Sequence, residues 1–172
     1  MIEKKLQNKM RTIRIEKIVL NIGAGTEADN VEKAVQLLGR ISGKKSVKTL
    51  TTKRIANWKL RPGLPVGAMV TLRGKPAEEL LKRLLQAIEF EMAKESFTEN
   101  GFSFGIKEYI DIPGVKYDPK TGVIGLEVSV RLMRPGFSVK RRKKRKGKIA
   151  KVHKILAEDS LNFAKSLGVK LK

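Results

Sequence analysis

The segment IGLEVSVRL, residues 124–132, has the cleanest two-residue period in the chain. Apolar and polar side chains alternate along it, the apolar ones being Ile124, Leu126, Val128, Val130 and Leu132 and the polar ones Glu127, Ser129 and Arg131. Successive side chains of a β-strand point to opposite faces, so the pattern predicts a strand with one face in a core and the other in solvent. Such half-buried strands are typical of antiparallel sheets.

Patterns of the same kind predict the other elements. Alternation of apolar residues indicates strands at residues 13–22, 46–52, 66–72 and 106–112. Helical spacing and end signals predict helices at residues 29–43, 76–92 and 157–167. The parity of the first strand changes near Lys17, which predicts a β-bulge there. Residues 97–104, which contain glycine and aromatic residues, are expected to form a loop.

Hairpin-like pairs of strands mixed with helices predict an α+β fold. We expect a two-layer α/β sandwich with a mostly antiparallel sheet and the helices on one face. The length of 172 residues suits one domain, residues 1–172, with an N-terminal extension at residues 1–10. Two basic segments are expected within this domain, a loop at residues 53–65 and a C-terminal segment at residues 137–152.

The charge of the chain is large and unevenly placed. The formal net charge is +21 and the pI is about 10.4. Residues 33–77 hold 11 Lys or Arg and no Asp or Glu, and residues 128–157 hold 12 basic residues and no acid. An ordinary solvated surface mixes both signs. The separation therefore predicts a basic side that faces a polyanion, and a pI above 9 is typical of nucleic-acid binders.

Composition excludes several other classes. There is no Cys and only one His, so thiolate sites, histidine metal sites and Cys nucleophiles are not expected, and the sequence shows no Ser/His/Asp arrangement. We therefore expect neither an enzyme nor a cofactor. No apolar run approaches the ~20 residues that span a bilayer, and no apolar segment follows the N-terminal lysines as it would in a secretory signal. A cytoplasmic location is the default expectation.

The glycines after the first strand match a dinucleotide-binding pattern, G-x-G-x-x-A, at Gly23, Gly25 and Ala28. Glu27 and Asp29 lie where a pyrophosphate would bind and would repel it, and no further α/β repeats follow. A tight strand-to-helix turn explains the same residues. An NADP-binding reductase remains a minor alternative.

The loop at residues 53–65 combines cations with one tryptophan and two prolines. Cations contact phosphates and an aromatic ring can stack on an unpaired base. The candidate contacts are Lys53, Arg54, Lys59 and Arg61, together with Trp58. Trp58 could instead fold back onto the core, since Trp is often partly buried.

Residues 140–148 contain eight basic residues in nine, namely Lys140, Arg141, Arg142, Lys143, Lys144, Arg145, Lys146 and Lys148. Any lattice of phosphates would attract this run, so it favours RNA over DNA only weakly. A general DNA- or RNA-binding protein of the chromatin type is therefore the second hypothesis. Binding to a membrane surface is disfavoured because no bulky aromatic face adjoins the run.

Three blocks of sequence, in this order, resemble the large-subunit ribosomal protein five family. They are RIEKIVLNIGAG at residues 14–25, RPGLPVGAMVTLRG at residues 61–74 and GFSFGIKEYIDIPGVKY at residues 101–117. Separated blocks in matching order are more specific than any single motif. The basic C-terminal segment resembles the archaeal and eukaryotic branch of the family.

The resemblance implies a ribosomal protein with a two-layer α/β sandwich that binds 5S ribosomal RNA and large-subunit ribosomal RNA in the central protuberance. By matching position, the candidate RNA-binding residues are Asn21, Lys44, Trp58 and Thr71. We add to this set the basic residues Lys45, Lys48 and Arg73 and the run at residues 140–148. Asn21 and Thr71 would contact base edges or 2′-hydroxyls, and Lys44 a phosphate.

The resemblance also implies further partners. The loop at residues 53–65 is similar to the family's loop that reaches peptidyl-site transfer RNA. A neighbouring large-subunit protein would share the 5S RNA, and a small-subunit protein would meet the chain at a bridge between the subunits. No membrane partner and no metal are implied.

Overall fold

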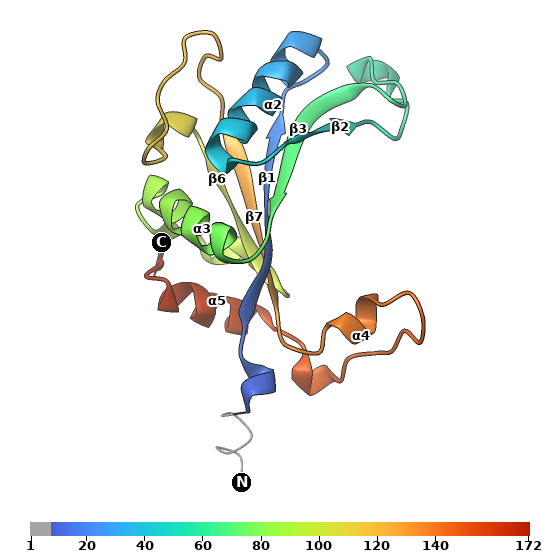
Figure 1. Ribbon diagram of the computed structural model, residues 1–172, viewed down its shortest axis with the longest axis vertical. Helices are drawn as coiled ribbons and strands as arrows, with labels where there is room; N and C mark the ends of the chain where they lie inside the picture. The colour runs from blue at the N-terminus through green and yellow to red at the C-terminus, as the bar shows by residue number, and fades with distance from the viewer. Residues whose placement is uncertain (1–7) are drawn as a thin grey trace.

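The computed structural model describes residues 8–172, so most of the extension predicted at residues 1–10 lies outside the described residues. A six-stranded sheet with the order β2-β3-β1-β7-β6-β5 forms its centre (Figure 1). The strands are β1 Arg14–Gly23, β2 Val47–Leu50, β3 Pro65–Leu72, β5 Phe97–Thr98, β6 Gly101–Ile106 and β7 Leu126–Met133. Every neighbouring pair in this sheet is antiparallel.

Helices cover one side of the sheet. The α-helices are α2 Ala28–Ser42, α3 Lys75–Ala87, α4 Ser138–Arg141 and α5 Ala157–Ser166, and a small parallel ribbon pairs β4 Glu91–Met92 with β8 Lys170–Leu171. Figure 1 shows α2, α3 and α5 on the same side, whereas the short α4 projects to the other. Among the described helices, none combines the length and the apolar character needed to cross a membrane.

The core lies between this helical layer and one face of the sheet. Alternate residues of each central strand point into it, for example Ile18, Leu20 and Val128, which are fully buried. The helices contribute apolar stripes at helical spacing, such as Val31, Ala34, Leu38 and Ile41 of α2. The predicted α+β sandwich with a mostly antiparallel sheet is therefore confirmed.

Local signals account for how these elements begin and end. The register of β1 against β7 shifts between Ile15 and Lys17, so Glu16 is the extra residue of the predicted bulge. Gly43 ends α2 in the left-handed conformation, with φ of 64°, which glycine adopts without a steric cost. At the start of α5, Leu156 has no capping side chain, and the carboxylate of Asp159 accepts a hydrogen bond from its N–H instead.

Two sequence expectations between α3 and β7 are wrong. Residues 97–104 are not a loop, because β5 and β6 form a hairpin in which Phe97 lies opposite Phe102. Residues 106–112 are not a strand, because β6 ends at Ile106 and a 3₁₀ turn follows at Tyr109–Asp111. Tyr109 and Ile112 are three residues apart and both buried, a spacing that a 3₁₀ turn places on one side. Helix α3 also ends earlier than expected, at Ala87.

The long connection before β7 is tied to the helical layer. Asp118 forms an ion pair with Arg40 of α2 at 2.5 Å, and its backbone N–H donates to the hydroxyl of Tyr109 at 3.0 Å. The hydrogen bond from Arg40, and next the backbone N–H of Lys120, hold the pKa of Asp118 below its usual value of 3.8. Because the pKa of this carboxyl is lower in the folded than in the unfolded protein, its interactions stabilise the fold at pH values above the pKa of the unfolded state. This stabilisation is lost as the pH falls through the pKa of the folded state.

Candidate nucleic-acid interface

The second face of the sheet is not covered by α2, α3 or α5. The strand register sets its side chains in rows, of which one contains Val47, Met69, Asn21, Glu127 and Gly105 and the next contains Thr71, Val19, Ser129 and Ser103. We call this surface the open face. It presents amide, hydroxyl and carboxylate groups rather than a continuous apolar layer, so it can form hydrogen bonds with a partner.

A basic hairpin projects from one edge of the open face. The predicted loop at residues 53–65 continues the β2–β3 hairpin: Ile55 and Leu60 exchange two backbone hydrogen bonds of 3.1 and 3.0 Å, and a 3₁₀ turn at Ala56–Trp58 forms the tip. Trp58 is 67% exposed, so the alternative in which it folds onto the core is wrong. The four cations predicted as contacts, Lys53, Arg54, Lys59 and Arg61, are also exposed.

A second basic projection, which we call the arm, consists of residues 137–153 and includes α4. At its base the ring of Phe137 packs edge-on against His153, with centroids 5.8 Å apart. The Nε2 atom of His153 lies 2.9 Å from the carbonyl oxygen of Pro135, which can only accept, so Nε2 is the donor. His153 therefore holds the arm in shape. Between the basic run and α5 the chain forms a 3₁₀ turn at Lys151–His153.

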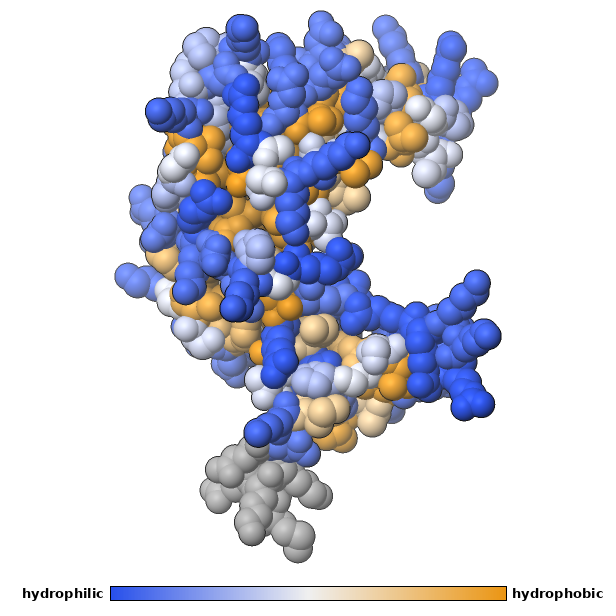
Figure 2. Space-filling model, viewed as in Figure 1, coloured by the Kyte–Doolittle hydropathy of each residue, from blue (hydrophilic) through white to orange (hydrophobic). Residues whose placement is uncertain are grey.

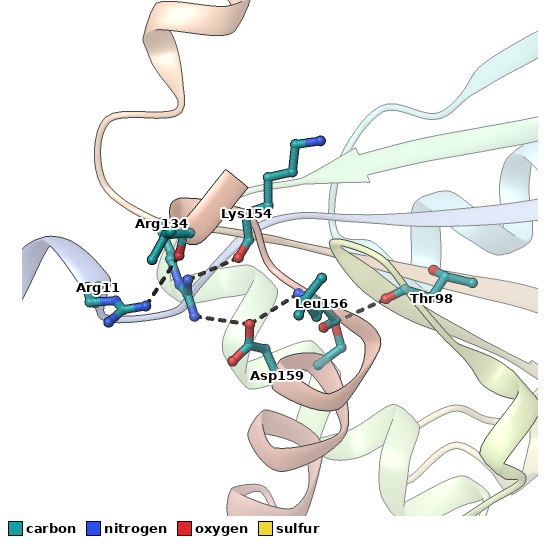
Figure 3. A network of polar contacts seen from close by, with 8 residues as sticks. Arg11, Thr98, Arg134, Lys154, Leu156 and Asp159 are labelled. Atoms are coloured by element: carbon teal, nitrogen blue, oxygen red, sulfur yellow. Dashed lines mark hydrogen bonds and ion pairs between the residues drawn. The ribbon is translucent and has the colours of Figure 1, made fainter. Parts of the chain in front are cut away.

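A buried arginine fixes the base of the arm to α5 (Figure 3). Arg134 is 6% exposed, and it pairs with Asp159 at 3.1 Å and donates to the carbonyl oxygen of Lys154 at 3.0 Å. Arg11 adds a hydrogen bond of 3.2 Å to the carbonyl oxygen of Val152. Both ends of the arm are thus bonded to the body of the protein, so the basic run projects from a fixed base.

A cleft of about 910 Å³ lies between the arm and the end of the sheet. Its charged lining is mostly basic and comprises Arg131, Lys140, Arg141, Lys146, Lys148, Lys151 and Lys154, with Glu16 and Glu99 as the acids. The side chain of Glu16 is 10% exposed and pairs with Arg131 at 3.4 Å and with Arg141. The bulge in β1 therefore anchors the arm, while the remaining cations can contact phosphate groups.

The hairpin tip, the open face and the arm together form a concave surface. Figure 2 shows the two projections on the same side of the molecule, with a deep hollow between them and hydrophilic side chains at both tips. Positive groups at both ends and hydrogen-bonding groups between them match a nucleic acid, whose phosphates are spread along its length and whose base edges are polar.

The structure brings only some of the predicted residues together. Asn21 and Thr71 lie on adjacent strands of the open face, in neighbouring rows. Lys44 and Lys45 are exposed in the turn before β2, and Arg73 is exposed just beyond β3. Lys48 differs from the expectation, because it points to the helical side and pairs with Glu32 of α2 at 3.1 Å.

Several residues of this surface were not among the sequence candidates. Arg131, Lys151 and Lys154 line the cleft, and Glu127 stands on the open face beside Asn21, with 3.3 Å between the Asn21 amide nitrogen and a Glu127 carboxylate oxygen. The alternation in residues 124–132 already placed Glu127 and Arg131 on the outer face of a strand. It could not show that no helix covers that face.

The structure does not support the enzyme alternative. A dinucleotide fold needs adjacent parallel strands around the glycine turn. Here β1 has antiparallel neighbours on both sides, and β3 lies between it and the parallel β2. Within residues 8–172 no group of three or more His, Asp or Glu side chains is placed to hold a metal ion.

Comparison with known proteins identifies the family. A profile described as "Ribosomal protein L5" matches residues 8–61, and a second profile, which describes the C-terminus of the same ribosomal family, matches residues 65–163. A Large ribosomal subunit protein uL5 from Nanoarchaeum equitans is 48% identical over 96% of this chain and 99% of its own length. The proteins of the same name from Sulfurisphaera tokodaii and Archaeoglobus fulgidus are 42% and 41% identical, over 96% and 95% of this chain and 94% and 92% of their own lengths.

Both halves of the chain thus match the family in order, and the relatives are archaeal, as the basic C-terminal segment indicated. The chain therefore belongs to the ribosomal protein L5 family and is a structural, non-enzymatic constituent of the large ribosomal subunit.

Proposed function

We propose that this protein binds 5S ribosomal RNA with its concave surface and joins it to large-subunit ribosomal RNA in the central protuberance. The open face contacts nucleotides of the 5S RNA, and the arm and cleft neutralise phosphates. The hairpin tip reaches transfer RNA in the peptidyl site. A neighbouring large-subunit protein shares the 5S RNA, and a small-subunit protein meets the chain at a bridge. Residues 1–172 act as one domain in which residues 53–65 and 137–152 are projections.

The observation that carries this proposal is the open face flanked by two basic projections. Folding of the sheet does not require cationic projections at the two ends of its solvent-exposed face, so a binding partner is the simpler explanation for them. Single-stranded and looped RNA offers phosphates at the periphery and unpaired bases between them. The membership of the L5 family favours ribosomal RNA among all polyanions.

A competition experiment distinguishes specific binding of 5S ribosomal RNA from the alternative, generic binding of any polyanion. We expect the protein to retain 5S ribosomal RNA of its source organism at moderate salt in excess transfer RNA and duplex DNA. Asn21→Ala and Thr71→Ala should each weaken this binding about three- to tenfold, the worth of one net hydrogen bond. Asn162→Ala, on the exposed side of α5, is the matched control. Displacement of the 5S RNA by either competitor would instead indicate affinity for phosphate lattices in general.

The proposed contact of the hairpin tip with transfer RNA can be followed by fluorescence. Trp58 is the only tryptophan of the chain and is 67% exposed, so all tryptophan emission from this chain comes from the tip. Stacking on a base or loss of water contact should quench or shift this emission when transfer RNA binds to assembled large subunits. Trp58→Phe supplies the background. Unchanged emission at saturating transfer RNA would argue against the contact.

A further inference from the structure

Four glycines lie on strands of the open face, and packing explains only two of them. A Cβ at Gly67 would collide with the carbonyl oxygen of Ile22, and one at Gly101 with that of Val130. At Gly23 and Gly105 no atom of the described residues 8–172 lies within 4 Å of such a Cβ, and neither glycine has a positive φ. Glycine inside a strand costs roughly 0.5–1 kcal/mol and often marks a place where a ligand approaches the backbone closely. Neither conformation nor packing requires glycine at these two positions.

These two glycines face the same shallow hollow of about 570 Å³, away from the cleft beside the arm. Gly125 also lines it, and a Cβ there would come within 2.8 Å of the carbonyl oxygen of Lys107. The floor is therefore bare backbone. The rim is polar, since Asn21 and Glu127 rise from β1 and β7 and the register sets Glu127 between Asn21 and Gly105. Lys107 supplies a cation at the edge.

The carboxylate of Glu127 would be unfavourable on this face if the face contacted only phosphates. A carboxylate has two acceptor oxygens and no donor, so it repels phosphate and needs N–H or O–H groups opposite it. Among residues 8–172 it receives one long hydrogen bond, of 3.3 Å from Asn21. Guanine is the base that presents two adjacent N–H donors, N1–H and the N2 amine, on its Watson–Crick edge. A flat floor without side chains accommodates the plane of a base, and unpaired bases are the part of RNA that proteins recognise in this way.

We propose that the hollow at Asn21, Gly105 and Glu127 receives an unpaired guanine of the bound RNA. The ring lies on the floor formed by Gly23, Gly105 and Gly125, its N1–H and N2 amine donate to Glu127, and Lys107 contacts an adjoining phosphate. This inference rests on the proposed function in so far as the guanine belongs to 5S ribosomal RNA. It identifies Glu127 as a residue that determines base specificity.

The variant Glu127→Gln tests the proposal through the sign of its effect. It keeps the shape of the side chain, removes one negative charge and replaces one acceptor oxygen by a donor. If the face binds phosphates only, loss of a negative charge tightens binding to 5S ribosomal RNA. If Glu127 accepts from guanine, binding weakens about tenfold or more, because hydrogen bonds to charged groups are the strong ones. Glu79→Gln, exposed on α3, makes the same change of charge on the helical side.

A second variant tests the floor. Gly105→Ala places a methyl group in open space, so the stability of the free protein should be unchanged or raised. Its affinity for the RNA should nevertheless fall about tenfold, because the methyl group holds the base away from the backbone. Wild-type affinity in both Gly105→Ala and Glu127→Gln would overturn the proposal.

A probe that does not depend on 5S RNA separates this inference from the proposed function. The probes are two short RNA single strands of adenosine and uridine that differ at one central position. One strand has guanosine there and the other has inosine, and inosine lacks the N2 amine. The wild-type protein should bind the guanosine strand several-fold more tightly, and Glu127→Gln should lose this preference. Equal binding of both strands by the wild-type protein contradicts the guanine site. Failure of the wild-type protein to retain 5S ribosomal RNA contradicts the proposed function instead.

Discussion

Replacing four lysines of the arm by glutamine is expected to lower the affinity for 5S ribosomal RNA about a hundredfold at moderate salt. The four are Lys143, Lys144, Lys146 and Lys148, all exposed and without an ion-pair partner among residues 8–172. Each phosphate contact contributes about half a decade of affinity over a fourfold change in salt. The slope of log affinity against log salt should therefore become shallower by about 3.

A matched variant distinguishes position from net charge. Both variants lower the formal charge from +21 by four, the control by replacing Lys75, Lys82, Lys94 and Lys165, which are exposed on the helical side. We expect the control to retain nearly all of the affinity and the slope. Equal losses in the two variants would show that long-range attraction by the whole chain, rather than contact by the arm, drives binding.

Asp159→Ala is expected to lower the free energy of unfolding by about 3–5 kcal/mol. The substitution removes the partner of Arg134, whose guanidinium is buried and has an Nε atom without a hydrogen-bond partner in the described residues. An unpaired buried charge costs more than the ion pair itself contributes. The same carboxylate accepts from the N–H of Leu156, so about 1 kcal/mol of the loss comes from the start of α5. Urea unfolding measures the change.

The conservative variant Asp159→Asn separates these two contributions. Its amide oxygen can still accept from Leu156, but it carries no charge to balance Arg134, so we expect about 1 kcal/mol less destabilisation than for alanine. The arm should also become more sensitive to trypsin in both variants, because its base depends on Arg134. A loss below about 1 kcal/mol in Asp159→Ala would mean that Arg134 does not hold the arm.

Local patterns predicted the elements whose burial follows from their own sequence. The strand at residues 124–132, the bulge near Lys17 and the glycine end of α2 are all found, because alternation, parity and φ preference act over a few residues. The β5–β6 hairpin was missed for the opposite reason. β5 has only two residues, too few to show a period, and it forms through its pairing with β6. In β6 the alternation of Phe102, Phe104 and Ile106 is short and flanked by glycine, and pairing with β7 and packing under α5 fix the strand.

The candidate site was predicted in part. The basic loop, the basic run and the positions Asn21 and Thr71 were named from composition and from the family resemblance, and the structure places them around one concave surface. Lys48 was added to the RNA-binding candidates for its charge, and strand parity directs it to Glu32 on the helical side, away from the concave surface. Glu127 was overlooked because an acid does not stand out as an RNA contact until its neighbours are known.

The sequence by itself determined the α+β class, the absence of cysteine chemistry, the separation of charge along the chain and the membership of the L5 family. These depend on residue types and on short-range order. Only the tertiary structure decided which face of the sheet stays open and which distant residues share it. Asn21 meets Glu127 across 106 positions and Glu16 meets Arg141 across 125, and such pairs depend on strand order and register, which no local pattern encodes.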